Sequence, residues 1–329
     1  MINFRYHLTT LIAVFLALGL GVVAGSTFVS PVTVTALKKS LTVLDNQDKV
    51  LAAQNQALAQ TNRGLLQYAT ASRDMLVRDT LKGHAALLLS FDTTPGNETA
   101  QVAATLVGAG ARLEGSIVLS SVLAVADDAG RQRVAAALGT PPSSAEAVQG
   151  VLVHQLTEAL SGRTPGVLQH LLDAGLASRG AGVPNDAQEA PAALATPGTA
   201  VVILAPVPVP SPAQAGPKPA PDVGRSLILP TVRSLSASSV LLAVGEDGTD
   251  PLPVLGPIRQ ESGLHVVTAD NVDSPAGQAA VALGLQQATT ANLWGSYGFG
   301  AGANSPLPPV LPPPASPVSA TATPQVKGG

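Results

Sequence analysis

A long apolar stretch lies near the N-terminus. Leu8–Val29 contains 22 residues and no charge. As a helix it would be about 33 Å long, and the hydrocarbon core of a bilayer is about 30 Å thick. We therefore predict a transmembrane anchor over residues 1–30. The alternative is a cleaved signal peptide, since Val22–Ser26 offers small residues for processing, although the apolar core of a signal peptide is usually only about 7 to 15 residues long.

Charged residues flank this stretch on both sides. Arg5 and His7 precede it, and Lys38 and Lys39 follow it. The N-terminal amine and Arg5 lie closest to the lipid, and positively charged flanks favour the cytoplasmic side of a membrane. We therefore expect a single-pass protein of the cell membrane or envelope, with a cytoplasmic N-terminus and the remaining chain outside.

Leucines recur at seven-residue spacing directly after the apolar stretch. They are Leu37, Leu44, Leu51, Leu58 and Leu65. Such spacing is typical of the d positions of a coiled coil. The a positions between these leucines are Leu41, Asp48, Asn55 and Asn62. Because Ser30-Pro31 is typical of a helix start, we predict a coiled-coil stalk over residues 31–82.

The polar a positions indicate how two such helices would pair. Buried amides at a positions, here Asn55 and Asn62, favour a parallel dimer in one register. Polar side chains at most a positions weaken the seam, and a membrane anchor offsets this by raising the local concentration of partners. We therefore predict a homodimer through this seam. The alternative is an amphipathic helix that packs on its own domain.

Short apolar runs alternate with helical periodicity from residue 83 to 298. The expected strands are His84–Ser90, Ser116–Leu119, Ala200–Ala205, Val240–Val244 and His265–Thr268. The expected helices are Thr99–Val107, Glu146–Leu160, Val167–Ser178, Ser226–Leu235, Val254–Ser262 and Pro275–Ala288. This alternation predicts an α/β domain, a Rossmann-like parallel sheet with helices on both faces.

Proline-rich segments interrupt and follow this domain. Pro206–Pro221 predicts a loop or partly disordered insert, near residues 206–222. The glycines of Gly298–Gly302 follow the last expected helix and lead into further proline-rich sequence. They are typical of a flexible linker, and we predict a disordered Gly/Pro-rich tail over residues 299–329.

Nucleotide-binding and catalytic motifs are absent from the sequence. The first strand is followed by Phe91–Asn97, which is no glycine-rich phosphate loop, and no P-loop lysine motif occurs. No nucleophile elbow, paired-histidine zinc motif or calcium-binding loop occurs either. We therefore expect no nucleotide cofactor and no enzymatic activity.

Composition excludes further classes of function. The net charge is -3 and the pI about 5.9, so the chain has no basic excess for nucleic acid. It has no cysteine, and its only methionines are Met1 and Met75. Soft ligands for Cu(I) are therefore nearly lacking, and Cu(II) would have to use imidazole and carboxylate groups.

One acidic turn is a candidate metal site. Asp270-Asn271-Val272-Asp273 follows the last expected strand, at the edge where open α/β sheets usually bind ligands. Asp270, Asp273 and the nearby His265 are candidate metal ligands. The alternative is a structural turn, in which Asp273 or Ser274 caps the helix that begins at Pro275.

Several of these segments together resemble one family. Asn3–Leu8, Gly21–Gly25, Asp270–Gln278 and Tyr297-Gly298 resemble the actinobacterial copper transport family MctB, over nearly the whole chain before the tail. The resemblance implies an envelope protein of copper export or homeostasis, with copper as a possible ligand.

A related member of this family implies a second function. The cell-separation factor SteB works with a cytoplasmic-membrane partner, SteA, to regulate a peptidoglycan hydrolase. By this analogy the chain would be a dimeric coiled-coil scaffold with a membrane or envelope protein partner. The missing active site and the heptad leucines are compatible with both functions.

Overall fold

The computed structural model describes residues 4–27, 31–164, 166–180, 196–206, 222–248 and 250–309. The chain divides into two compact units, Met1–Gln67 and Tyr68–Gly329. The predicted insert near residues 206–222 lies almost wholly outside the described residues, as does the predicted tail from residue 310 onward.

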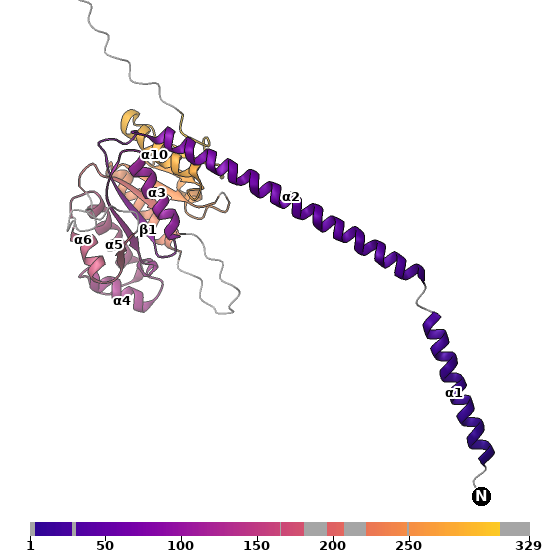
Figure 1. Ribbon diagram of the computed structural model, residues 1–329. Helices are drawn as coiled ribbons and strands as arrows, with labels where there is room; N and C mark the ends of the chain where they lie inside the picture. Colours follow the sequence, from indigo (N-terminus) through magenta and orange to yellow (C-terminus); the bar gives the residue numbers. More distant parts are fainter. Residues whose placement is uncertain are drawn as a thin grey trace, which may run out of the picture. The chain divides into compact units, whose positions relative to one another are not determined.

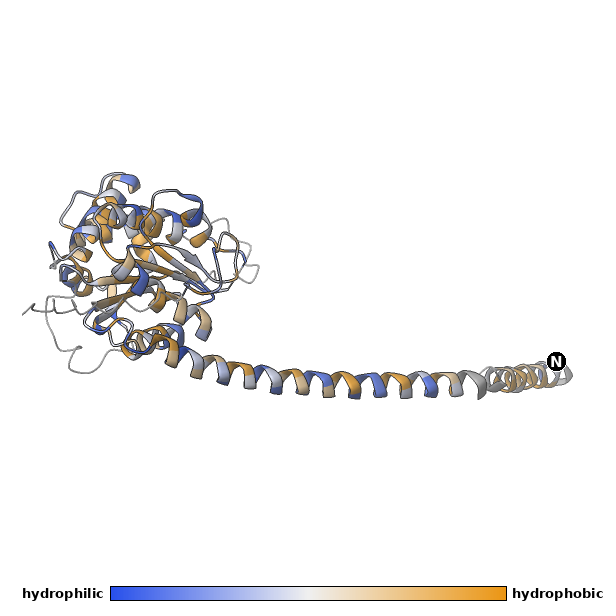
Figure 2. Ribbon diagram, turned by 90° about the horizontal axis from the view of Figure 1, so that it is seen from above, coloured by the Kyte–Doolittle hydropathy of each residue, from blue (hydrophilic) through white to orange (hydrophobic). Residues whose placement is uncertain are grey.

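The first unit contains an apolar helix, α1 (Phe4–Thr27), which Figure 2 colours mainly as hydrophobic. By length and composition, Tyr6–Gly25 could cross a membrane. The predicted apolar N-terminal helix is therefore confirmed, whereas its retention in the mature protein stays a prediction because a signal sequence has the same properties.

A second helix, α2 (Pro31–Val77), contains 47 residues and reaches into the second unit. Its sequence has no proline after Pro31 and is rich in Ala, Leu and Gln, which favour helices. Polar and apolar residues alternate along it in Figure 2. Its heptad leucines are exposed by 54–62%, and they are Leu37, Leu44, Leu51, Leu58 and Leu65.

The second unit is built on a seven-stranded sheet in the order β3-β2-β1-β4-β5-β6-β7. The strands are β1 (Ala85–Phe91), β2 (Arg112–Leu119), β3 (Ala177–Arg179), β4 (Ala200–Leu204), β5 (Leu242–Glu246), β6 (Val267–Asp270) and β7 (Ser296–Tyr297). All neighbouring strands are parallel except β2 and β3. The predicted parallel-sheet domain is thereby confirmed.

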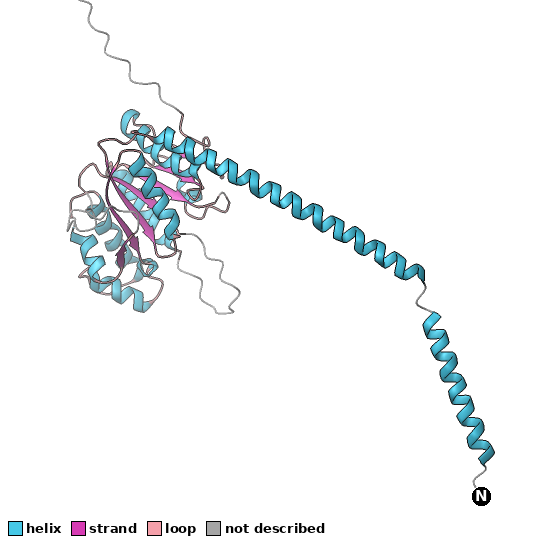
Figure 3. Cartoon of the chain, in the orientation of Figure 1, coloured by secondary structure: helices cyan, strands magenta, loops and turns pink. Residues whose placement is uncertain are grey.

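Helices cover both faces of this sheet, as Figures 1 and 3 show. Alternate residues of the central strand serve opposite faces, since Leu87 and Leu89 belong to one apolar core and Ala86 and Leu88 to the other. The first core is completed by α4 (Asp128–Ala137), α5 (Ala145–Leu160), α6 (Gly166–Asp173), α8 (Leu229–Ala237) and α9 (Leu255–Gln260). The second is completed by α3 (Gly96–Gly108), α10 (Pro275–Ala291) and the end of α2.

Some expected elements differ from those observed. The expected helix Val167–Ser178 ends at Asp173, because Gly175 adopts a positive φ of 64° and the chain then turns to form β3. β3 pairs antiparallel with β2. The expected helix Ser226–Leu235 begins with a π-helical turn, Gly224–Ile228, before α8. Two further elements, α4 and β7, lie where no helix or strand is expected.

The close packing of α10 on the sheet generates a prediction. A methyl group added at Gly284 would overlap the side chain of Val267 on β6 and lie 3.3 Å from the ring of Tyr297. We expect Gly284→Ala to lower the free energy of unfolding by about 1–3 kcal/mol through overpacking. Denaturant unfolding of the full chain in detergent measures this.

Gly150 of α5 is the matched control, because an added methyl there meets no atom within 4 Å. Gly150→Ala should leave the stability unchanged or raise it by up to about 1 kcal/mol, since alanine favours helix. Equal stability of the two variants would contradict close packing between α10 and β6.

Candidate functional site

The carboxyl ends of the parallel strands meet at one edge of the sheet. The order in which successive strands are added reverses between β1 and β4: β2 and β3 lie on one side of β1, and β4 to β7 lie on the other. Open α/β sheets bind ligands at such an edge. Three acidic residues follow strand ends here: Glu98 in the first turn of α3, Asp247 after β5, and Asp273 between β6 and α10.

These three carboxyl groups interact. Burial and, to a smaller extent, the charges of Asp247 and Asp273 together raise the pKa of Glu98 from 4.5 to about 7. Burial also raises the pKa of Asp273, from 3.8 to about 6, together with a side-chain hydrogen bond and the charge of Asp247. Glu98 is only 7% exposed. We refer to Glu98, Asp247 and Asp273 as the acidic cluster.

The acidic cluster offers oxygen ligands only, which suit hard cations and are acceptable to Cu(II). In the described part of the chain, no three His, Cys, Asp or Glu side chains are placed to hold a metal ion together. The acidic cluster can thus attract cations electrostatically, but it does not form a complete metal coordination sphere. Sequence reasoning missed Glu98 and Asp247, although Glu98 immediately precedes the expected helix Thr99–Val107 and Asp247 lies three residues after the expected strand Val240–Val244.

The candidate ligand Asp270 is engaged within the protein. Its carboxylate is fully buried and accepts hydrogen bonds from Arg259 Nη1 at 2.9 Å, from the Phe299 amide at 2.7 Å and from the Gly300 amide at 3.0 Å. A methyl group added at Gly298, whose φ is 125°, would overlap this carboxylate. Asp270 therefore anchors the loop that follows β7.

Arg259 fastens the same loop from the other side. Its guanidinium donates to the carbonyl oxygens of Tyr297 at 2.8 Å and Ala301 at 3.0 Å, and its Nε donates to Thr268 Oγ1 at 3.1 Å. The expected flexible linker at Gly298–Gly302 is therefore wrong: the glycines allow a close approach to Asp270. Residues 299–309 of the expected tail are described, and the carbonyl of Pro309 accepts from Gln287 Nε2.

The other two candidate ligands, His265 and Asp273, do not join Asp270 in a metal-binding group within the described residues. His265 precedes β6 and stacks on Trp294 with ring centroids 5.7 Å apart, so it lies at the amino end of the strand whose carboxyl end leads to Asp273. In the turn between β6 and α10, Ser274 Oγ accepts a hydrogen bond from the Gly277 amide at 3.2 Å and caps α10. The structural-turn alternative therefore describes Ser274, while Asp273 belongs to the acidic cluster.

A buried amide connects this turn to two helices. Gln278, at the start of α10 and 1% exposed, donates to the Val272 carbonyl at 3.1 Å and to Gln101 of α3 at 2.9 Å. Its Oε1 accepts from Arg73 near the end of α2. Because Val272 adjoins Asp273, one hydrogen-bond network connects the end of α2 to the turn that carries Asp273.

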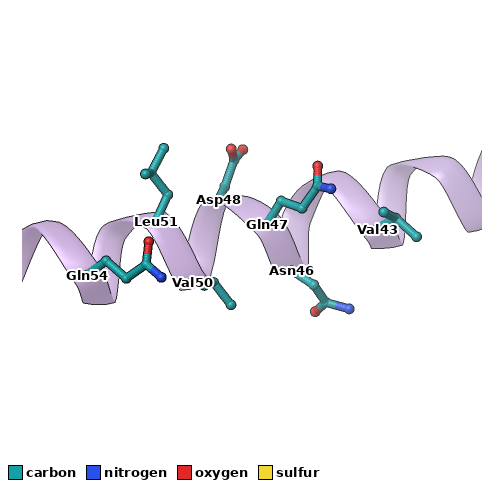
Figure 4. A pocket seen from close by; sticks show the side chains of 7 residues that line it. All are labelled: Val43, Asn46, Gln47, Asp48, Val50, Leu51 and Gln54. Atoms are coloured by element: carbon teal, nitrogen blue, oxygen red, sulfur yellow. The ribbon is translucent and has the colours of Figure 1, made fainter.

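α2 also carries a shallow depression, which Figure 4 shows. The side chains around it all come from one helix and point outward from it. They are Val43, Asn46, Gln47, Asp48, Val50, Leu51 and Gln54. Side chains of a single helix cannot enclose a small molecule, so this depression is a helix surface and no ligand cavity.

Comparison with known proteins now identifies the family. Residues 1–308 match the family described as copper transport outer membrane protein, MctB. The chain belongs to the MctB family. It is also similar to the copper transporter MctB of Mycobacterium leprae, with 26% identity over 321 residues that cover 93% of this chain and 98% of the relative.

Membership of the MctB family confirms the resemblance found in the sequence. The match extends from the apolar helix through the domain to the loop after β7, so it includes the acidic cluster and the Asp270 anchor. The cell-separation alternative is not favoured, because both comparisons name copper transport.

The buried pair of Arg259 and Asp270 generates a second prediction. Removing the guanidinium leaves a buried carboxylate without its countercharge, which typically costs about 3–5 kcal/mol. We expect Arg259→Met to lower the stability by this amount and to expose the loop after β7 to proteolysis. Arg163→Met is the control, since Arg163 pairs with Glu158 at the surface and such pairs contribute about 0–1 kcal/mol.

Both quantities are measurable on the full chain in detergent, by denaturant unfolding and by limited proteolysis. A loop cut equally fast in the parent chain and in Arg259→Met would contradict the anchoring role.

The raised pKa of Glu98 generates a third prediction. Between pH 4.5 and 7 the folded chain retains a proton on Glu98 that the unfolded chain releases, so stability falls as pH rises through this window. Glu98→Gln cannot ionise and should lose this part of the pH dependence. It should therefore become more stable relative to the parent chain as the pH rises from 5 to about 7.5.

Unfolding at both pH values measures the difference, and Glu146→Gln is the control. Glu146 also lies in the first turn of its helix, α5, but is exposed. A Glu98→Gln variant with the pH slope of the parent chain would show that Glu98 is ionised in the folded protein throughout this range.

Proposed function

We propose that this chain is a membrane-anchored protein of the cell envelope that acts in copper export or copper homeostasis. The observation that carries the proposal is the match to the MctB family over residues 1–308. The similarity to a relative named as a copper transporter over 98% of that relative's length points to the same role. A transport family also supports a function without catalysis.

The architecture supports anchoring at a membrane. α1 would span the bilayer, and Arg5 beside it favours a cytoplasmic N-terminus with the α/β domain outside. One helix cannot line a pore alone, so transport across the membrane would require an assembly of several chains.

Two finer features belong to this proposal. The order of the parallel strands, with β1 between β2 and β4, supports a Rossmann-like domain, from which the short antiparallel β3 departs. The exposed heptad leucines of α2, with Asn55 and Asn62 between them, support a parallel coiled-coil homodimer.

The chemistry of the domain favours Cu(II) over Cu(I). The chain offers no thiol and two thioethers, and Cu(I) prefers such soft ligands. The acidic cluster offers carboxylates at the edge of the sheet where ligands bind. We assign it the first contact with Cu(II), in the form that prevails when Glu98 and Asp273 are ionised, above pH about 7.

Metal titration of the full chain in lipid nanodiscs tests this assignment, with Cu(II) and Cu(I) each measured against a competing chelator. We expect Cu(II) to bind at pH 7.5, and more weakly at pH 5.5, where protons compete for Glu98 and Asp273. The combined variant Glu98→Gln, Asp247→Asn, Asp273→Asn should bind Cu(II) on the order of tenfold more weakly or not at all.

A control variant neutralises three surface acids of the same domain, Asp128→Asn, Glu146→Gln and Glu158→Gln, and should bind as the parent chain does. Equal loss in both variants would mean that net charge attracts the metal and that the cluster is no site. Absence of binding by either copper ion, together with normal copper tolerance of cells that lack the protein, would overturn the copper role.

A further inference from the structure

The last turns of α2 have one side fixed to their own domain. Val77 and the following Leu81 are each 1% exposed in the core beneath α3 and α10, and Arg73 donates to the buried Gln278. Figure 1 shows this end of α2 beside α10. These contacts all lie within the second unit, which begins at Tyr68.

Another side of the same turns is uncharged and carries three exposed apolar side chains. Tyr68 is 74% exposed, Met75 75% and Leu76 45%. Ala69 and Ser72 lie between them on the same helical face and are half-buried. We call Tyr68, Ala69, Ser72, Met75 and Leu76 the outer face of α2.

The outer face continues the heptad register of the stalk. Seven residues after Asn62 comes Ala69, and seven more lead to Leu76, so both occupy a positions. Seven residues after Leu65 comes Ser72, a d position, and Tyr68 and Met75 occupy the flanking g positions. Of the domain contacts, Val77 occupies a b position away from the seam and Arg73 an e position at its edge, so the a and d positions themselves are not taken up by these two contacts.

We infer that the outer face docks on the outer face of a second copy of this chain, so that the dimer seam extends past the stalk and joins the two α/β domains. This inference rests on the coiled-coil dimer proposed above. It adds a domain-level interface, and through Arg73 and Gln278 it links that interface to the turn carrying Asp273.

A second copy fits this face better than another partner does. Two copies anchored in one membrane by α1 must run parallel, and the Asn55 and Asn62 amides pair with their own counterparts only in equal register. In that register Leu76 meets Leu76 of the other copy, and the small Ala69 and Ser72 permit close approach. None of the outer-face side chains is charged, so like charges do not oppose one another there.

Disulfide trapping tests the inference in membranes, because the chain has no cysteine of its own. Ala69→Cys, Ser72→Cys and Leu76→Cys report on the outer face, and Leu44→Cys and Leu58→Cys report on the stalk. Gln67→Cys, on the opposite side of the helix, is the control. Disulfides require Cα atoms about 4.4–6.8 Å apart, which only seam positions satisfy.

Under a mild oxidant we expect the outer-face cysteines to crosslink as fast as the stalk cysteines, and on the order of tenfold faster than Gln67→Cys. Crosslinks in the stalk without crosslinks at the outer face would overturn this inference and leave the proposed dimer standing. Crosslinking at none of the seam positions would overturn both.

Two further results would also contradict the inference. Equal crosslinking at Gln67→Cys would show random collision of chains in the membrane. A crosslinked product at Leu76→Cys with the mass of a different protein would assign the outer face to another partner.

Discussion

The carboxyl edge of the sheet depends on a buried ion pair between Arg259 and Asp270. Burying two charges is costly, and here hydrogen bonds offset the cost by satisfying both partners. Asp270 accepts hydrogen bonds from two backbone amides in addition to Arg259. The Arg259 guanidinium also donates to two carbonyl oxygens and one hydroxyl oxygen. Glu246, at the end of the neighbouring strand, similarly accepts the amides of Val254 and Leu255. Donors of the chain itself thus hydrogen-bond to the two most deeply buried carboxylates, Asp270 and Glu246. The acidic cluster does not take part in these hydrogen bonds.

Local pattern predicted the parts of the fold that contain a long apolar run. β1, β4 and α10 follow directly from such runs, whereas β3 and β7 have three and two residues and exist only because a neighbouring strand pairs with them. The candidate site divides in the same way. Asp273 was identifiable from its place after a strand, but Arg259 meets Asp270 only through tertiary packing. His265 comes before β6 in the sequence and Asp273 comes after it. Because an extended strand keeps its two ends apart, the sequence alone argues against a site that contains both.

The scarcity of soft ligands and the raised pKa values lead to one view of how the proposed site would bind a metal. A carboxylate must be ionised to bind a cation, so protons and metal compete for Glu98 and Asp273 near neutral pH. Burial that raises the pKa of Glu98 also excludes water, which strengthens attraction to a cation once the proton has left. Such a site would hold a metal reversibly, as handling of a cargo requires, in contrast to a thiolate site with a closed coordination sphere.

α2 belongs to both units, and this gives it two physical tasks. Its first part exposes leucines separated by Asp48, Asn55 and Asn62, and polar a positions specify register at a cost in stability. In the proposed dimer, membrane anchoring would offset part of that cost by confining the partners, and an apolar Leu76 layer would offset more where the helix is already ordered by its domain. Ordering matters because a helix fixed by Val77 and Gln278 loses little further freedom when it pairs. The seam is therefore expected to be firmest at the domain and loosest at Asp48, where two like charges would face each other.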